Sequence, residues 1–160
     1  MTTLFKVLTE IGLPTHGNAK PISYPLPVQV KTAKTGVVHW KAGEWLPAIG
    51  KPAACERGYH LTSRPSRWWG PGYRLFVAEY RGAMDFQSPD KVACESVRLV
   101  EEVTHEWPLL PLYPEIKVLL VASWRSRNLE ASSLPDWADL SGADLSGANL
   151  SGANLGGAYL

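Results

Sequence analysis

The chain has 160 residues, of which 45% are apolar and 19% charged, and its formal net charge is +1. These values describe a globular chain with room for one domain of ordinary size and a short appendage. Two cysteines, Cys55 and Cys94, are too few for a disulfide framework, and no apolar run approaches the length of a membrane span. The N-terminus, MTTLFK, lacks the basic and then apolar layout of a signal peptide, so we expect a cytoplasmic protein.

The small net charge hides an uneven distribution. Residues 1–129 hold all 16 Lys and Arg and 11 of the 15 acidic residues, which gives this part a net charge of +5. Residues 130–160 hold the other four acidic residues and no Lys or Arg, which gives −4. A basic body with an acidic tail can favour head-to-tail association. Solvated surface charge is the alternative interpretation.

The first third of the chain alternates short apolar runs with proline-rich sequence. Leu4–Leu8 (LFKVL) is expected to form a strand. The four prolines from Pro14 to Pro27 each remove a backbone donor, which indicates a surface loop rather than a central strand. Val37–Trp40 is a further short strand candidate.

The middle of the chain carries the clearest strand pattern. Arg74–Tyr80 alternates in polarity and Lys91–Val103 is rich in valine, so both are predicted strands. Ser63–Pro65 is typical of a cap with proline in the first turn of a short helix, and residues 114–127 begin with Pro-Glu and end in basic residues, as helices do. Residues 1–129 are therefore predicted to be a small α+β domain with an antiparallel or mixed sheet and one or two helices.

A five-residue unit recurs over residues 138–160, which read ADLSG-ADLSG-ANLSG-ANLGG-AYL. Each unit contains glycine, which costs a helix about 1 kcal/mol relative to alanine, and Ser-Gly is turn chemistry. The chain is therefore expected to change direction once per unit, with one large and one small apolar side chain inside. The predicted interior residues are Ala138, Leu140, Ala143, Leu145, Ala148, Leu150, Ala153 and Leu155.

This A(D/N)LxG unit resembles the pentapeptide-repeat family. The resemblance implies a right-handed, four-sided β-helix with one unit per side, so residues 138–160 would form about one coil. Residues 130–137 would then be a linker or cap. A flexible Gly/Ser/Ala-rich tail is the alternative interpretation, although such a tail has no need for leucine at every fifth position.

One coil of such a β-helix has no neighbouring coil to receive its outward hydrogen bonds, and solenoids need several stacked repeats. We therefore expect that the end near Leu160 meets another chain, packs on the N-terminal domain, frays, or continues in a longer protein. The predicted function is non-catalytic binding, with the repeats as a surface for self-association or for a protein partner. The residues predicted to form this surface are Asp139, Asp144, Asn149, Asn154, Tyr159 and Leu160.

The remainder of the chain carries a second resemblance. The opening FKVL, the phrase CERGYH at residues 55–60, the segment RLFVAEYRG and the later RLVEEVT are together similar to a small domain of unknown function in bacteriophage and bacterial proteins. The resemblance spans about residues 4–125 and brings no established activity. It implies a phage-type accessory or host-interaction protein, located in the host cytoplasm.

An enzymatic alternative rests on a loose similarity to ADP-ribosyltransferases. It is carried by residues 57–63, the later AEYRG segment and an earlier Thr-His-Gly. The similarity implies that His16 contacts the ribose of NAD and that Tyr59 stacks on nicotinamide, with His60 as a further candidate. The catalytic glutamate stays open among three residues: Glu95, Glu101 and Glu102. The binding interpretation requires no cofactor.

Metal and thiol chemistry find little support in the sequence. Cys55, His60, Cys94 and His105 do not have the spacing of a zinc site, so no metal site is predicted. A nucleophilic pair of Cys55 and His60 lacks an identifiable residue to orient it.

Nucleic-acid binding is a further alternative. Several arginines and aromatic residues between 57 and 74 suit phosphate contact and base stacking: Arg57, Arg64, Arg67, Arg74, Trp68, Trp69 and Tyr73. The domain is only mildly basic, so a nucleic-acid partner is not expected. Imitation of DNA by the repeats, as in topoisomerase inhibitors of the family, needs regularly placed acids. Here Asp139 and Asp144 are followed by the neutral Asn149 and Asn154.

Overall fold

The computed structural model describes part of the chain: residues 3–15, 22–53, 56–69, 73–88, 90–104, 106–117 and 120. The chain divides into two compact units. The first comprises Met1–Trp68 and Tyr73–Val103, and the second comprises Trp69–Gly72 and Thr104–Leu160. The expected domain boundaries at 129 and 137 and the whole repeat segment lie outside the described residues, so the β-helix coil stays a prediction.

A four-stranded sheet forms the centre of the first unit. Its strands, in the order in which they lie side by side, are β1 (Leu4–Leu8), β5 (Arg74–Ser88), β6 (Lys91–Glu102) and β4 (Tyr59–Leu61). Every neighbouring pair is antiparallel. Of the two predicted sheet types, the antiparallel one is therefore correct for this sheet.

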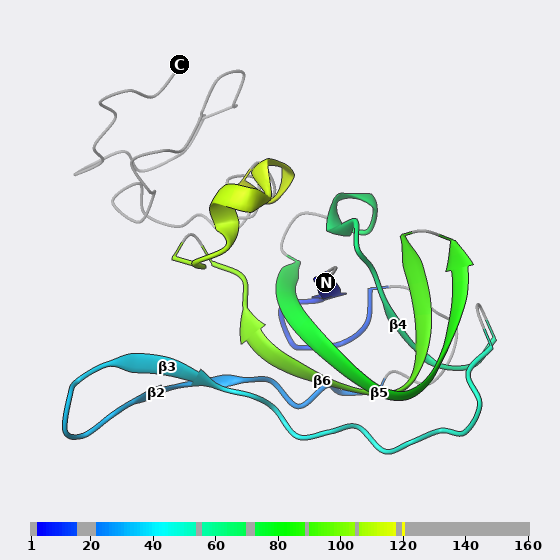
Figure 1. Cartoon of the computed structure of the whole chain (residues 1–160), viewed down its shortest axis with the longest axis horizontal. Helices are drawn as coiled ribbons and strands as arrows, with labels where there is room; N and C mark the ends of the chain where they lie inside the picture. The colour runs from blue at the N-terminus through cyan, green and yellow to red at the C-terminus, as the bar shows by residue number, and fades with distance from the viewer. Residues whose placement is uncertain are drawn as a thin grey trace. The chain divides into compact units, whose positions relative to one another are not determined.

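The two outer strands of this sheet are joined to each other as well. Just past β4, the backbone N–H of Thr62 donates to the carbonyl of Phe5 in β1 at 2.9 Å, and the N–H of Phe5 donates to the carbonyl of Thr62 at 2.8 Å. The sheet thus closes into a small barrel. Figure 1 shows the curvature of β5 and β6 that this closure requires.

The barrel interior follows from the register of the strands. Side chains at paired positions share a face, so Leu4 lies beside Ala78 and Tyr59 beside Cys94. The buried core of the barrel comprises Leu8, Tyr24, Leu46, Tyr59, Leu61, Phe76, Ala78, Val92, Cys94, Val97 and Leu99. Lys6 has the same parity as Leu4 and Leu8, which places a lysine on the interior face of β1.

Segment 43–49 extends the sheet without being a regular strand. The N–H groups of Gly43, Leu46 and Ile49 donate to the carbonyls of Leu99, Val97 and Glu95 in β6. From one of these hydrogen bonds to the next, the segment advances by three residues while β6 advances by two. The segment lies along the same edge of β6 as β4: β4 pairs with residues 92–94, and the segment bonds to residues 95–99. Trp45, in the middle of the segment, lies next to β6 for this reason.

The strand β5 is interrupted by irregularities in its register. These lie between Val77 and Ala78, between Arg81 and Met84, and between Phe86 and Ser88. At the second one, Gly82 has a φ of +79°, and the Glu95 carboxylate accepts a hydrogen bond from the N–H of Ala83 at 2.9 Å. Such bulges bend a strand and make its edge a poor template for pairing.

A two-stranded antiparallel hairpin makes up the second sheet. It consists of β2 (Val28–Lys31) and β3 (Val38–Lys41), and it extends away from the barrel (Figure 1). Most of its side chains are exposed, including Val28 and Val38, which are each 53% exposed.

Helical structure is scarce in the described residues. A single 3-10 turn, η1 (Pro65–Arg67), stands where a short helix was expected after Ser63–Pro65. In the second unit, η2 (Leu110–Leu112) precedes a helical segment at residues 114–117 and at residue 120. The start of the helix expected at 114–127 is thus confirmed, and most of the rest lies outside the described residues. No helix in the described part of the chain is long and apolar enough to cross a membrane.

The described part of the second unit is small. Trp107, Leu110 and Ile116 are buried, and the rings of Trp107 and Tyr113 lie 5.3 Å apart between centroids. Most of the regular structure in the described chain is therefore β, which corrects the balance of the expected α+β class toward strands.

Candidate binding surfaces

The residues predicted for a nucleotide site do not converge where they are described. Tyr59 is buried, donates from its hydroxyl to the carbonyl of Pro47 at 3.0 Å, and meets Tyr24 edge to face at 6.2 Å. The next residue, His60, pairs with Ala93 and points to the other face of β4. Because Tyr59 is packed in this way, its ring has no free face on which nicotinamide could stack. His16 lies outside the described residues.

The three candidate glutamates lie on β6. Glu95 accepts from the N–H of Ala83, and Glu102 forms a two-pronged ion pair with Arg74, at 2.6 and 2.8 Å. Glu101 lies opposite Val77 in the sheet. Both contacts of Glu95 and Glu102 hold neighbouring parts of β5 and β6 together, which is a structural role.

An unexpected feature is the ammonium group of Lys6. It donates to the carbonyl of His60 at 2.9 Å and lies 4.9 Å from the centroid of the Tyr24 ring. None of the described carboxylates forms an ion pair with it. Burial, and secondarily the charge of Lys91, lowers the pKa of Lys6 from 10.5 to about 8.

His60 belongs to the same electropositive region. Its Nε2 atom is buried and has no hydrogen-bond partner. Burial lowers the pKa of His60 from 6.5 to about 4, and the charges of Lys91 and Lys6 add to the effect. The imidazole is therefore neutral at physiological pH, and among the described residues no carboxylate is ion-paired with Lys6 or hydrogen-bonded to Nε2 of His60. Burial likewise raises the pKa of the Cys94 thiol, to about 11, which leaves it unreactive.

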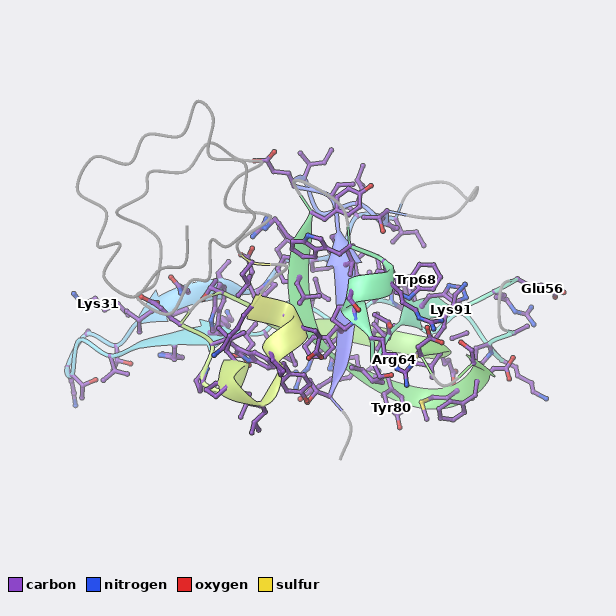
Figure 2. The ribbon with its side chains drawn as sticks, turned by 90° about the horizontal axis from the view of Figure 1, so that it is seen from above. Lys31, Glu56, Arg64, Trp68, Tyr80 and Lys91 are labelled. Carbon is purple, nitrogen blue, oxygen red and sulfur yellow. The ribbon has the colours of Figure 1, made fainter. Side chains whose placement is uncertain are left out.

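The arginines and tryptophans that suggested nucleic-acid contact are largely engaged within the protein. Arg67 forms an ion pair with Asp90 at 3.0 Å. The pKa of the Asp90 carboxyl is lowered, mainly by the hydrogen bond from Ser88, and the charge of Arg67 is a smaller cause. The ammonium of Lys91 lies 5.2 Å from the ring centroid of Trp68. Figure 2 shows Trp68, Lys91 and Arg64 gathered on one side of the barrel.

A second cationic stack surrounds Trp45. Its ring centroid lies 4.6 Å from the guanidinium carbon of Arg81 and 4.9 Å from that of Arg98. Arg98 also pairs with Glu79 at 2.7 Å, while Arg81 donates to the hydroxyl of Ser96 at 3.3 Å. The stack fastens segment 43–49 to the outside of β5 and β6, because Trp45 comes from that segment and both arginines from the strands.

Metal-binding geometry is not present among the described residues, where no three His, Cys, Asp or Glu side chains come together. Cys55 and His105, two of the four residues considered from the sequence, lie outside the described residues. Cys94 is completely buried in the barrel.

The comparisons with known proteins concern the C-terminal segment. Residues 136–160 match the family model described as pentapeptide repeats (8 copies). This match supports the repeat family for the segment in which the five-residue unit was recognised. No curated protein and no solved structure matches the chain. The resemblance of residues 4–125 to a phage and bacterial domain is therefore without support from these comparisons.

Proposed function

We propose that this chain is a non-catalytic binding protein whose repeat segment, residues 138–160, contacts other protein chains. The observation that carries the proposal is the match of residues 136–160 to pentapeptide repeats, since repeat segments of this kind generally serve protein interactions. The contact surface comprises the outward polar residues and the open end: Asp139, Asp144, Asn149, Asn154, Tyr159 and Leu160.

In this proposal, the barrel of the first unit is a carrier for the repeats. Its closed sheet and its dense core give it a stable body, and its polar side chains are engaged mainly in holding strands together. No contact among the described residues favours the ADP-ribosyltransferase-like alternative, because Tyr59 and His60 point to opposite faces of β4. We include a cytoplasmic location and a phage-type role in the proposal, and both are supported by the sequence alone.

The interaction partner in the simplest form of the proposal is a second copy of the chain. One coil of repeats presents an end at which a second coil can add its strands, which supplies the stacked neighbour that a solenoid needs. An isologous contact of this kind closes as a dimer.

The experiment is sedimentation velocity of the full chain over a range of concentrations. The repeat variant, Leu145→Asp/Leu150→Asp, places two charges at interior positions of the repeat, whereas the matched control, Leu109→Asp/Leu112→Asp, places two charges at exposed leucines outside it. The wild type and the control variant are expected to self-associate, and the repeat variant to stay monomeric. Equal masses for the wild type and the repeat variant would overturn the proposal.

A further inference from the structure

The β2–β3 hairpin ends in a turn that fixes its geometry. The N–H of Thr32 donates to the carbonyl of Val37 and the N–H of Gly36 donates to the carbonyl of Thr32, both at 2.8 Å. Gly36 has a φ of +69°. The four residues 33–36 therefore connect Thr32 and Val37, a common loop length in hairpins, and the register is regular over the four residue pairs that follow.

That register determines which backbone groups of the hairpin face outward. Hydrogen-bonded and non-hydrogen-bonded pairs alternate along an antiparallel ladder, and Thr32 and Val37 form a hydrogen-bonded pair. The pairs Val30–His39 and Val28–Lys41 are then hydrogen-bonded as well. The N–H and C=O groups of the intervening residues therefore point away from the ladder. These residues are Gln29 and Lys31 on β2 and Val38 and Trp40 on β3.

The hairpin also differs from the edge of β5 that extends past β1. Residues 79–88 of β5 extend beyond the end of β1, but two register shifts and Gly82 distort that stretch. The register of β2 and β3 has no such shift. Flat, regular edges are the ones to which a further strand can be added, and a two-stranded hairpin without a third strand is only marginally stable in water.

Among the described residues of the first unit, the excess of positive charge lies in this hairpin. Among the described residues of this unit outside the hairpin, nine Lys and Arg are balanced by nine Asp and Glu. The hairpin adds Lys31, Lys34 and Lys41, and residues 22–43 contain no acidic residue. None of these three lysines is in an ion pair with a described carboxylate. Figure 2 shows Lys31 on the hairpin, well away from the cluster of Trp68, Lys91 and Arg64.

Each face of the hairpin combines cationic and aliphatic side chains. Lys41 is paired with Val28 on one face, and Lys31 is paired with Val38 on the other. Both valines are 53% exposed, and Val37 in the turn is 59% exposed. Exposed aliphatic side chains between lysines fit a polypeptide better than a nucleic acid, which offers phosphates and base edges but few apolar groups.

We infer that the β2–β3 hairpin is a docking arm for the acidic segment, residues 130–144, of a second copy of this chain. This segment contains Glu130, Asp136, Asp139 and Asp144, no Lys or Arg, and the aliphatic Leu134 between the acids. It is thus opposite in charge to the hairpin and similar in its mixture of charged and aliphatic residues. Strand addition to a hairpin edge, guided by these charges, joins the body of one copy to the tail of the next.

The inference rests on the proposed function, because it adds a second contact between two copies, from the acidic segment to the hairpin, beside the contact of coil with coil. A contact from the hairpin of one copy to the tail of another is heterologous, so two copies can close by exchanging tails reciprocally. The lysines are exposed, so the contact weakens as salt screens charges beyond about 8–10 Å.

The test uses charge-swapped full-length chains. One variant carries Lys31→Glu/Lys34→Glu in the hairpin, another carries Asp139→Lys/Asp144→Lys in the tail, and a third carries all four changes. Lys51→Glu/Arg64→Glu is the matched control, since both residues are exposed cations outside the hairpin. Sedimentation velocity and circular dichroism report association and folding of each variant.

Each of the two-residue swaps is expected to weaken association roughly tenfold, the effect of two or three exposed ion pairs. An equimolar mixture of the two, and the four-residue variant, are expected to restore it, while the control associates like the wild type. The inference would be overturned if neither the mixture nor the four-residue variant restored association. It would also be overturned if the control variant weakened association as much as the charge swaps do.

Two further outcomes separate this inference from the proposed function. If the Leu145→Asp/Leu150→Asp variant is monomeric but the charge swaps associate normally, the repeats mediate self-association and the hairpin does not. If a short DNA duplex binds the wild type and not the Lys31→Glu/Lys34→Glu variant, while association is unchanged, the hairpin is a nucleic-acid arm and the inference is wrong. A wild type that stays monomeric at every concentration contradicts both proposals.

Discussion

Replacement of Lys6 by methionine is expected to make the protein more stable at neutral pH. Lys6 lies on the interior face of β1 and has no ion pair with a described carboxylate. Its ammonium is held by one carbonyl, that of His60, and by the ring of Tyr24. Methionine has a similar stem without the charge, so it fits the same space.

The size of the effect follows from the pKa. The shift of Lys6 from 10.5 to about 8 corresponds to about 3 kcal/mol at about 1.4 kcal/mol per pH unit. Lys6 retains some exposed surface, and its removal leaves the carbonyl of His60 without this donor, at a cost of about 1 kcal/mol. We therefore expect the free energy of unfolding at pH 7 to rise by about 1–2 kcal/mol in Lys6→Met.

The pH dependence provides the sharper test. In the folded chain, Lys6 releases its proton near pH 8, and in the unfolded chain near pH 10.5. Between these values the unfolded chain binds more protons, so the stability of the wild type gains from rising pH. The difference between wild type and Lys6→Met is therefore constant below pH 8 and decreases toward pH 10.5.

The assay is urea unfolding at a series of pH values from 7 to 10.5. The thiol of Cys94, whose pKa is raised from 9.0 to about 11, acts in the opposite direction above pH 9, but it is present in both proteins. Lys34→Met, on the exposed hairpin, is the matched control and is expected to change the free energy of unfolding by less than about 0.5 kcal/mol. A destabilised Lys6→Met protein, or a difference that does not vary with pH, would refute the reasoning.

Three further substitutions test other parts of the barrel. The pKa of His60 is lowered to about 4, so the folded chain binds fewer protons than the unfolded chain between pH 4 and 6.5. Acidification through this range should lower the free energy of unfolding by roughly 1–2 kcal/mol, given partial burial, and His60→Gln should remove this pH dependence in urea unfolding. Gly82→Ala should lower the free energy of unfolding by about 2 kcal/mol, because φ is +79° and the new Cβ meets the Glu95 carboxylate. Gly50→Ala, where φ is +78° and the space around the new Cβ is open, should lower it by about 1 kcal/mol, and equal losses would contradict the packing at Gly82. Tyr59→Phe should cost about 1 kcal/mol in thermal unfolding through loss of its hydroxyl hydrogen bond, and an unchanged melting temperature would show that this bond does not contribute.

The parts of the fold that could be predicted from the sequence are those with a long polarity pattern. Leu4–Leu8 was predicted with the bounds that the structure has, and Arg74–Tyr80 and Lys91–Val103 correspond to the start of β5 and to β6. The extension of β5 to Ser88 was missed because Gly82 and the bulges interrupt the alternation.

The short elements could not be predicted in the same way. The three residues of β4 and the four of β2 are too few to establish a period. Closure of the barrel depends on the backbone pair of Phe5 and Thr62, which are far apart in the sequence and carry no pattern that links them. Pro65 favoured a helix start, but the structure continues it only as one 3-10 turn.

The candidate sites, too, could be predicted from the sequence only in part. The repeat unit was recognised from the sequence, and the match of residues 136–160 supports it. The hairpin was half predicted, through the strand at Val37–Trp40, and its excess of lysines became visible only when the charges of the first unit were placed in the structure. Lys6 carried a usable signal, because it alternates with Leu4 and Leu8 in an apolar strand.

Hydrogen exchange of the full chain, measured below and above the concentration of self-association, tests the central claim most directly. If the repeats bind a second copy, amides of residues 138–160 gain protection at high concentration, and amides of the β2–β3 hairpin gain protection with them. A mass increase with new protection confined to other segments, or no concentration dependence at all, would contradict a protein-binding role for the repeats.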